Sequence, residues 1–205
     1  MSKKLLEMQQ QMLGSRDVKV RDVPKKIKAE LRTYQKEGAN WLERLRQMHL
    51  NGILADDMGL GKTLQAIIVI TQYLTDNPKS VSLIISPTSL VYNWKEEFHK
   101  FNPEIKTLII DGTPTQRKKL IEQIHDYDVI ITSYSLLQKD IEAYSATTLG
   151  YVILDEAQHI KNRGTRNAKS VKRSGCCCNS ASNCSACVRA RIRFSASSGA
   201  ALNRM

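Results

Sequence analysis

The chain has 205 residues, 41% of them apolar, which suits one domain of ordinary size with a buried core. Lys and Arg exceed Asp and Glu by 11, which at face value suggests a polyanionic partner. The excess is uneven, because the residues after Glu156 contain no Asp or Glu, so the body is nearly neutral and the C-terminal end is cationic. No apolar run reaches the roughly 18 residues of a membrane span, and the first residues soon turn polar, so we expect neither a membrane protein nor a secretory signal.

Hydrophobic patterns predict helices and strands that alternate along the chain. Residues 1–28 are polar and mixed in charge, with a hint of helical spacing from Leu5 to Leu13, and a clear helical period runs from Leu31 to Leu50. Short apolar runs then alternate with helical stretches. The predicted strands are 52–55, 81–85, 107–110, 128–131 and 151–154, and the predicted helices are about 62–76, 89–100, 114–125 and 134–143.

This alternation indicates the fold class. The apolar runs lack a period of two, as strands that are buried on both faces do. Strands that alternate with helices predict an α/β fold with a parallel sheet, flanking helices and right-handed crossovers. Ligands bind such sheets at the carboxyl ends of the strands, so functional residues should directly follow the apolar runs.

A phosphate-binding loop follows the first predicted strand. The segment Asp56–Thr63 is similar to the pattern G-x-x-x-x-G-K-[ST], with Asp56 in place of the first glycine. Gly59 and Gly61 let the backbone turn its N–H groups toward phosphates, Lys62 reaches the β- and γ-phosphates, and the Thr63 hydroxyl binds Mg²⁺. A glycine turn that merely feeds a helix is the alternative explanation.

Two carboxylates follow the last predicted strand. Four apolar residues are followed directly by Asp155 and Glu156, which is a Walker B pattern. Asp155 is expected to hold Mg²⁺, and Glu156 to orient or deprotonate the attacking water, so Glu156 and Lys62 are the predicted catalytic residues. A polar strand end at the start of a loop is the alternative, but Lys62 and Thr63 upstream complete a nucleotide and Mg²⁺ half-site.

Five ordered segments together resemble the first RecA-like lobe of the Snf2 (Swi2/Snf2) family of helicase-like ATPases in superfamily 2. They are Leu31–Leu42, Gly52–Thr63, Ser86–Trp94, Ile131–Tyr134 and Asp155–Asn162. The resemblance covers about residues 29–173, with an N-terminal segment 1–28 before it and a tail 174–205 after it. In that family Asp56 is the usual residue, so the departure from the general loop pattern supports the assignment.

The resemblance implies a set of site residues. Gln35 would contact adenine, and the nucleotide-binding set is Arg32, Gln35, Asp57, Met58, Gly59, Leu60, Gly61, Lys62, Thr63 and Leu64. Thr63 and Asp155 would hold Mg²⁺. The expected DNA contacts are Pro87, Thr88, Ser133, Tyr134 and Lys161, through hydroxyls, backbone N–H groups or charge on phosphates. For Trp94, core packing is the favoured explanation.

The implied function is that of a DNA-dependent ATPase that uses ATP and Mg²⁺ and moves along double-stranded DNA without reading its sequence. DNA-bound proteins are further expected partners. A catalytically inactive fragment or pseudogene product that binds nucleotide or DNA at most is the alternative, and Gln35 with the Asp155–Gln158 string argues against another P-loop class such as a kinase. We expect a cytoplasmic protein, associated with the nucleoid in a prokaryote, with a nuclear location as the alternative.

The resemblance stops after Arg173. The family continues with motif III, whose strand lies between the strands of motifs I and II, and with a second lobe that carries arginine fingers, so we expect this chain alone to turn over ATP poorly. Residues 174–205 are rich in Ser, Ala and Cys and contain no Asp, Glu or Lys, which predicts disorder.

Three explanations of this tail stay open. The first is a native basic tail, and the second, which we favour, is an out-of-frame translation product. The third is a zinc site at Cys178, Cys184 and Cys187, which we do not expect. All five cysteines lie in the tail, and a body without cysteine is typical of a reducing, intracellular environment.

Overall fold

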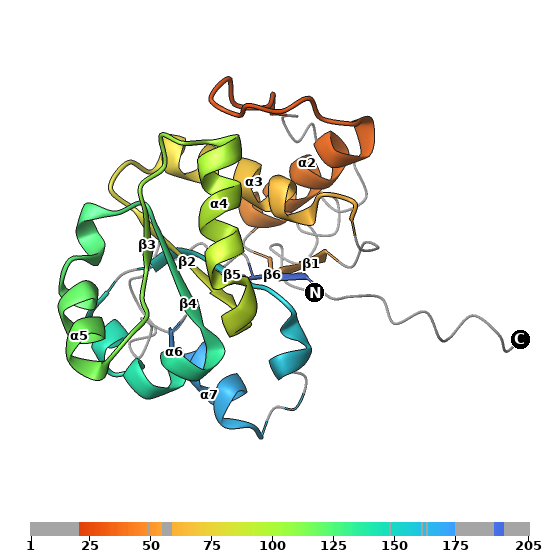
Figure 1. Ribbon diagram of the computed structural model, residues 1–205. Helices are drawn as coiled ribbons and strands as arrows, with labels where there is room; N and C mark the ends of the chain where they lie inside the picture. Colours follow the sequence, from red (N-terminus) through yellow and green to blue (C-terminus); the bar gives the residue numbers. More distant parts are fainter. Residues whose placement is uncertain are drawn as a thin grey trace, which may run out of the picture.

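The computed structural model describes residues 21–48, 50–54, 59–147, 149–160, 162, 164–174 and 191–194. Figure 1 shows the arrangement of the elements. The strands are β1 (Gly52–Leu54), β2 (Val81–Ser86), β3 (Thr107–Ile109), β4 (Val129–Ser133), β5 (Leu149–Leu154) and β6 (Arg191–Phe194). The α-helices are α2 (Thr33–Gln47), α3 (Lys62–Asp76), α4 (Val91–Phe101), α5 (Pro114–Glu122), α6 (Tyr134–Asp140) and α7 (Arg166–Ser174). Short 3₁₀ helices are η1 (Thr88–Leu90), η2 (Ile124–Asp126), η3 (Ala143–Ala146) and η4 (Ala157–Ile160). The N-terminal helical spacing noted in the sequence lies outside the described residues.

The strands form one parallel sheet with helices on both faces, which confirms the predicted RecA-like α/β fold. The strand order in the described residues is β1-β6-β5-β2-β4-β3. Helices α2, α3 and α4 pack on one face, and α5, α6 and α7 pack on the other (Figure 1). No helix in the described part of the chain is long and apolar enough to cross a membrane.

The central helix α3 carries the phosphate-binding loop at its N-terminus and is fixed on several sides. Ile67, Ile68, Val69 and Ile70 are all fully buried, because α3 lies between the sheet, α2 and α4. Ion pairs join its C-terminal end to α2. Arg46 of α2 pairs with the buried Glu43 and reaches the carboxylate of Asp76 at 3.3 Å. Helix α2 and its Gln35 are thereby held in place beside the loop.

Residues 191–194, in the tail where we expected disorder, form the strand β6. Strand β6 lies between β1 and β5 and pairs in parallel with both, with Ile192 in register with Gly52 and with Ile153. Without it, two strand edges inside the sheet would leave backbone groups unpaired, and an extended segment satisfies both edges. This is the place expected for the missing motif III strand.

The composition of the tail hid a local pattern. Arg191 to Phe194 alternate between charged and apolar residues, which is the period of two of a strand, but four residues are too few to stand out from a biased segment. The other tail residues, 175–190 and 195–205, lie outside the described part of the chain, and so do the cysteines. The out-of-frame explanation stays a prediction.

The position of β6 predicts the effect of a proline in it. Ile192→Pro should lower the free energy of unfolding by about 1–3 kcal/mol, because proline lacks the N–H that a central strand needs. Ile192→Val keeps a β-branched side chain and should change stability much less. Chemical denaturation followed by circular dichroism checks both variants. Equal stability of the two would contradict a central position for this strand.

Candidate nucleotide-binding site

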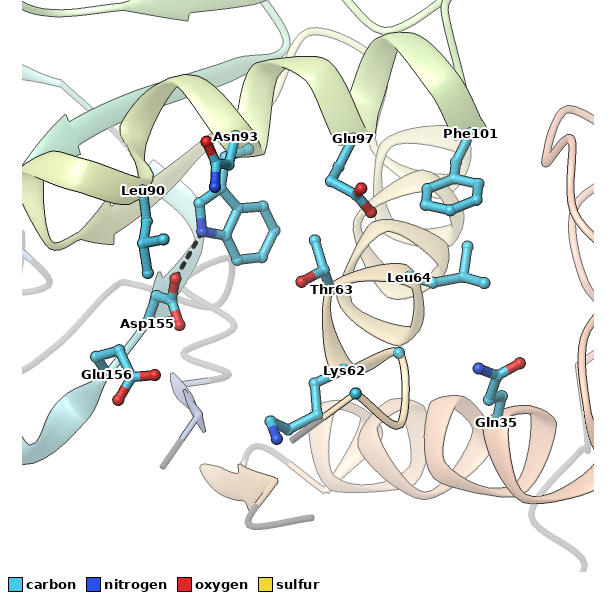
Figure 2. A pocket seen from close by; sticks show the side chains of 13 residues that line it. Gln35, Lys62, Thr63, Leu64, Leu90, Asn93, Glu97, Phe101, Asp155 and Glu156 are labelled. Atoms are coloured by element: carbon cyan, nitrogen blue, oxygen red, sulfur yellow. Dashed lines mark hydrogen bonds between the residues drawn. The ribbon is translucent and has the colours of Figure 1, made fainter. Parts of the chain in front are cut away.

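A cavity of about 500 Å³ opens at the carboxyl ends of β1 and β5. Figure 2 shows that its lining side chains come from α2, the phosphate-binding loop, α3, α4 and the end of β5. The cavity is lined by Gln35, Gly59, Gly61, Lys62, Thr63, Leu64, Leu90, Asn93, Trp94, Glu97, Phe101, Asp155 and Glu156. Residues more than 90 positions apart in the sequence thus meet at the edge of the sheet where we expected the site.

The loop before α3 has the backbone conformation of an anion site. Gly59 and Gly61 have φ angles of +84° and +74°, which glycine adopts without strain. Helix α3 begins at Lys62, and its N-cap Gly61 offers no side chain to the first N–H groups of the helix. These N–H groups and the helix dipole favour a bound anion such as phosphate. Predicted residues Asp57 and Met58 lie outside the described part of the chain.

Gln35 supports the loop from the side of α2. Its side-chain nitrogen Nε2 donates to the carbonyl of Leu60 at 3.2 Å, and its Oε1 accepts from the backbone N–H of Arg32 at 3.0 Å. Gln35 is buried and lines the cavity, whereas the Arg32 side chain is exposed and is not among the lining residues. Gln35 is therefore bonded to the loop as well as placed at the cavity wall.

Asp155 is held at three points at the end of β5. Its side chain is buried, and its Oδ2 accepts a hydrogen bond from the indole N–H of Trp94 at 2.9 Å, drawn as a dashed line in Figure 2. Its carbonyl accepts from the hydroxyl of Tyr134 at 2.7 Å, and its N–H donates to Ile85 at 2.8 Å. Burial raises the pKa of Asp155, and the bond from Trp94 opposes that rise.

Glu156 stands in a strained conformation next to Asp155. Its φ of +47° lies in the left-handed region that is costly for a residue with a side chain, and such strain gathers at functional sites. Its Oε2 is buried and accepts no hydrogen bond within the described structure. A buried carboxylate oxygen without a partner needs a donor or a cation, which a bound water or a metal would supply.

The residues that line the cavity have the chemistry to bind Mg²⁺ as part of a complex with a nucleotide. Mg²⁺ usually takes one or two protein ligands and completes its shell with phosphates and waters. Among the described residues no group of three or more His, Cys, Asp or Glu side chains could hold a metal by itself. Thr63 and Asp155 both line the cavity, and a hydroxyl and a carboxylate are oxygen groups of the kind that a Mg²⁺–nucleotide complex takes as ligands.

Comparison with known proteins settles the family. The model of the SNF2-related domain matches residues 34–175. The chain belongs to this family. The TATA-binding protein-associated factor MOT1 of Saccharomyces cerevisiae is 43% identical over 175 residues, which cover 80% of this chain and 9% of that protein. The helicase SWR1 of the same yeast is 41% identical over 165 residues, covering 78% of this chain and 11% of that protein.

A solved structure agrees with this assignment. The SWI2/SNF2 ATPase core of Sulfolobus solfataricus in complex with double-stranded DNA superposes with a TM-score of 0.71 at 34% identity. The match covers 86% of this chain and 34% of the archaeal one. The SNF2-related chain described here therefore spans about a tenth of the two yeast relatives and a third of the archaeal ATPase core.

The expected DNA-contact residues of this SNF2-related chain differ in accessibility. Thr88 in η1 is exposed, and Pro87 before it is half-buried. Ser133 is buried, and its hydroxyl caps α6 by accepting the N–H of Leu136 at 3.3 Å. Tyr134 is buried and its hydroxyl is bonded to Asp155, which argues against a direct DNA contact by this side chain. Lys161 lies outside the described residues.

Sequence reasoning missed one wall of the cavity. Its members share one face of η1 and α4, at spacings of three to four residues: Leu90, Asn93, Trp94, Glu97 and Phe101. That spacing is visible in the sequence but also fits a helix that simply packs on a sheet. Core packing of Trp94 agrees with its burial, yet its hydrogen bond to Asp155 has no local sequence signal.

The loop geometry predicts that Gly61→Ala will impair the site. The added Cβ would lie 2.5 Å from Nε2 of Gln35, and a φ of +74° disfavours alanine by about 1–2 kcal/mol. Gly164→Ala is the matched control, because an added Cβ there meets nothing within 4 Å. Thermal melting and binding of fluorescent ADP compare the two variants. Normal binding by Gly61→Ala would show that the loop conformation is not required.

Proposed function

We propose that this SNF2-related chain is the ATP-binding lobe of a DNA-dependent ATPase motor that moves along double-stranded DNA. One observation carries the proposal: the loop at Gly59–Thr63, Gln35, and the pair Asp155 and Glu156 line one cavity. Family membership supports the same reading, since the matched archaeal structure is an ATPase core with double-stranded DNA.

Different residues of the cavity would bind different parts of ATP. The N–H groups at the start of α3 and the ammonium group of Lys62 would hold the phosphates. Gln35 would face the adenine, and Thr63 and Asp155 would hold Mg²⁺. When bound, Mg²⁺ supplies charge stabilisation for the transferring phosphoryl group. Glu156, whose Oε2 has no hydrogen-bond partner among the described residues, would orient the attacking water and take its proton.

The extent of the match decides which activity we assign to this segment. The chain corresponds to a third of the archaeal core, so we assign it nucleotide binding, and we assign translocation to the whole motor. The alternative is a module that binds nucleotide or DNA without turnover. The purified chain should hydrolyse ATP poorly in either case. Weak DNA-stimulated hydrolysis that is lost in Glu156→Gln would favour the motor lobe, whereas nucleotide binding with no turnover at all would favour the module.

Lys62 provides the direct test of nucleotide binding. Lys62→Ala should weaken the binding of fluorescent ADP with Mg²⁺ by about 10- to 100-fold, because it removes a charge-assisted bond to phosphate. Lys119→Ala, at an exposed position of α5 on the other face of the sheet, is the control and should bind as the unchanged chain does. Equal affinities of the two variants would refute the proposed site.

Among the expected DNA-contact residues, we propose a contact with DNA for those that are exposed. A threonine hydroxyl binds a phosphate oxygen without reading the base sequence, and Thr88 is accessible for this. The function would place the protein on DNA, whereas a cytoplasmic or nucleoid location stays a prediction. DNA-bound proteins as further partners also stay a proposal.

Thr88→Ala should weaken binding of a labelled DNA duplex about five-fold, since a neutral hydrogen bond contributes about 1 kcal/mol. The affinity of the unchanged chain should fall as salt rises and should not depend on the duplex sequence. Thr115→Ala, at an exposed position of α5, is the control. Fluorescence anisotropy with two unrelated duplexes gives both readouts, and a loss shared by both variants would refute a specific role of Thr88.

A further inference from the structure

Two aromatic side chains from different elements bind Asp155. Trp94 of α4 donates its indole N–H to the carboxylate at 2.9 Å, and Tyr134 of α6 donates its hydroxyl to the carbonyl at 2.7 Å. Both aromatic side chains are almost completely buried, at 3% and 4% exposure. Each bond therefore replaces water as the partner of a polar atom of Asp155.

These bonds determine where the carboxylate of Asp155 points. A carboxylate has two oxygens, and the bond from Trp94 engages Oδ2 at the wall of the cavity (Figure 2). The bond from Tyr134 fixes the peptide group from which the same side chain departs. A donor behind a metal ligand orients the ligand, and removal of such a donor commonly weakens metal binding by about 10- to 100-fold.

Both aromatic residues belong to segments that adjoin the proposed DNA contacts. Helix α4, which carries Trp94, directly follows η1 with its exposed Thr88. Tyr134 also stacks on the ring of His159 in η4, with ring centroids 5.3 Å apart, so it touches the segment on both sides of Glu156. A shift of η1 and α4 would therefore reach Asp155 through one hydrogen bond.

We propose that Trp94 and Tyr134 are positioning residues that hold Asp155 for Mg²⁺ and connect it to the DNA-facing segments. The inference rests on the proposed function, because that function assigns Mg²⁺ to Asp155. Packing alone is the competing explanation, since Trp94 also lies against Phe98 with ring centroids 6.3 Å apart. A packing role would lower stability but would leave the dependence of nucleotide binding on Mg²⁺ unchanged.

The first experiment measures this dependence in the full chain without DNA. The binding of N-methylanthraniloyl-ADP, excited directly, is titrated with Mg²⁺ in the unchanged chain, Trp94→Phe and Tyr134→Phe. Each substitution keeps the aromatic packing and removes one donor. We expect the half-saturating Mg²⁺ concentration to rise about ten-fold for Trp94→Phe, beyond any change in the affinity for the ADP probe in excess chelator.

Matched changes at exposed positions serve as controls. Trp41→Phe in α2 and Tyr92→Phe in α4 alter side chains that are 42% and 57% exposed and do not line the cavity. They should leave the Mg²⁺ titration unchanged. If Trp94→Phe melts at a lower temperature but titrates like the unchanged chain, the positioning role is overturned while the proposed function stands. If the unchanged chain binds no ADP probe at any Mg²⁺ concentration, the proposed function itself fails, and the inference fails with it.

A spectroscopic measurement tests the same bond without removing it. The chain has two tryptophans, so the Trp41→Phe variant leaves Trp94 as its only indole. Addition of Mg²⁺ to this variant with unlabelled ADP should change the emission of Trp94, because the metal alters the charge on its hydrogen-bond acceptor. Asp155→Asn in the same background should abolish the change. If Trp41→Phe binds the nucleotide but its tryptophan emission does not change when Mg²⁺ is added, the inference is overturned.

Discussion

The two halves of the nucleotide site lie on strands that do not touch each other. Strand β1 leads to the phosphate-binding loop and β5 leads to Asp155, and β6 lies between them with hydrogen bonds to both. The distance between Lys62 and Asp155 is thus set by one intervening strand. Parallel strands are spaced at about 4.8 Å, so a missing or displaced β6 would move one half of the site relative to the other.

The burial of Asp155 is the second condition that the site must meet. A buried carboxylate is unfavourable unless hydrogen bonds or a cation compensate for lost water. Trp94 supplies one such bond, and a bound cation would supply the larger compensation. The same burial that disfavours the charged group when it has no cation beside it therefore strengthens its attraction to a metal, because the local dielectric constant is low.

Local patterns in the sequence predicted much of the fold. The predicted helix at 62–76 matches α3, because Gly61 sets its start and Asn77 and Pro78 follow its end. The predicted strands appear within a few residues of their expected ends, since buried strands leave uninterrupted apolar runs. Site residues that directly follow those strands were predictable for the same reason, as the carboxyl ends of parallel strands meet at one edge.

Other features depend on contacts that no local pattern encodes. Trp94 and Asp155 are 61 residues apart, and their hydrogen bond exists only because the fold brings Trp94 of α4 to the end of β5. Helix α7 is not among the predicted helices, because its sequence is dominated by Arg and Lys, and it packs on the sheet through Ala168 and Val171. The strand β6 is a response to two open strand edges rather than to a strong strand preference of its own.

The left-handed backbone of Glu156 sets the stability of the protein against the presence of a carboxylate at this position. Such a conformation costs of order 1–3 kcal/mol for a residue with a side chain, and glycine would relieve most of that cost. Selection for heat resistance alone should therefore favour glycine at position 156, and the protein would lose its carboxylate at the cavity as it gained stability. Retention of glutamate in a population would then report that turnover, and not only folding, is under selection.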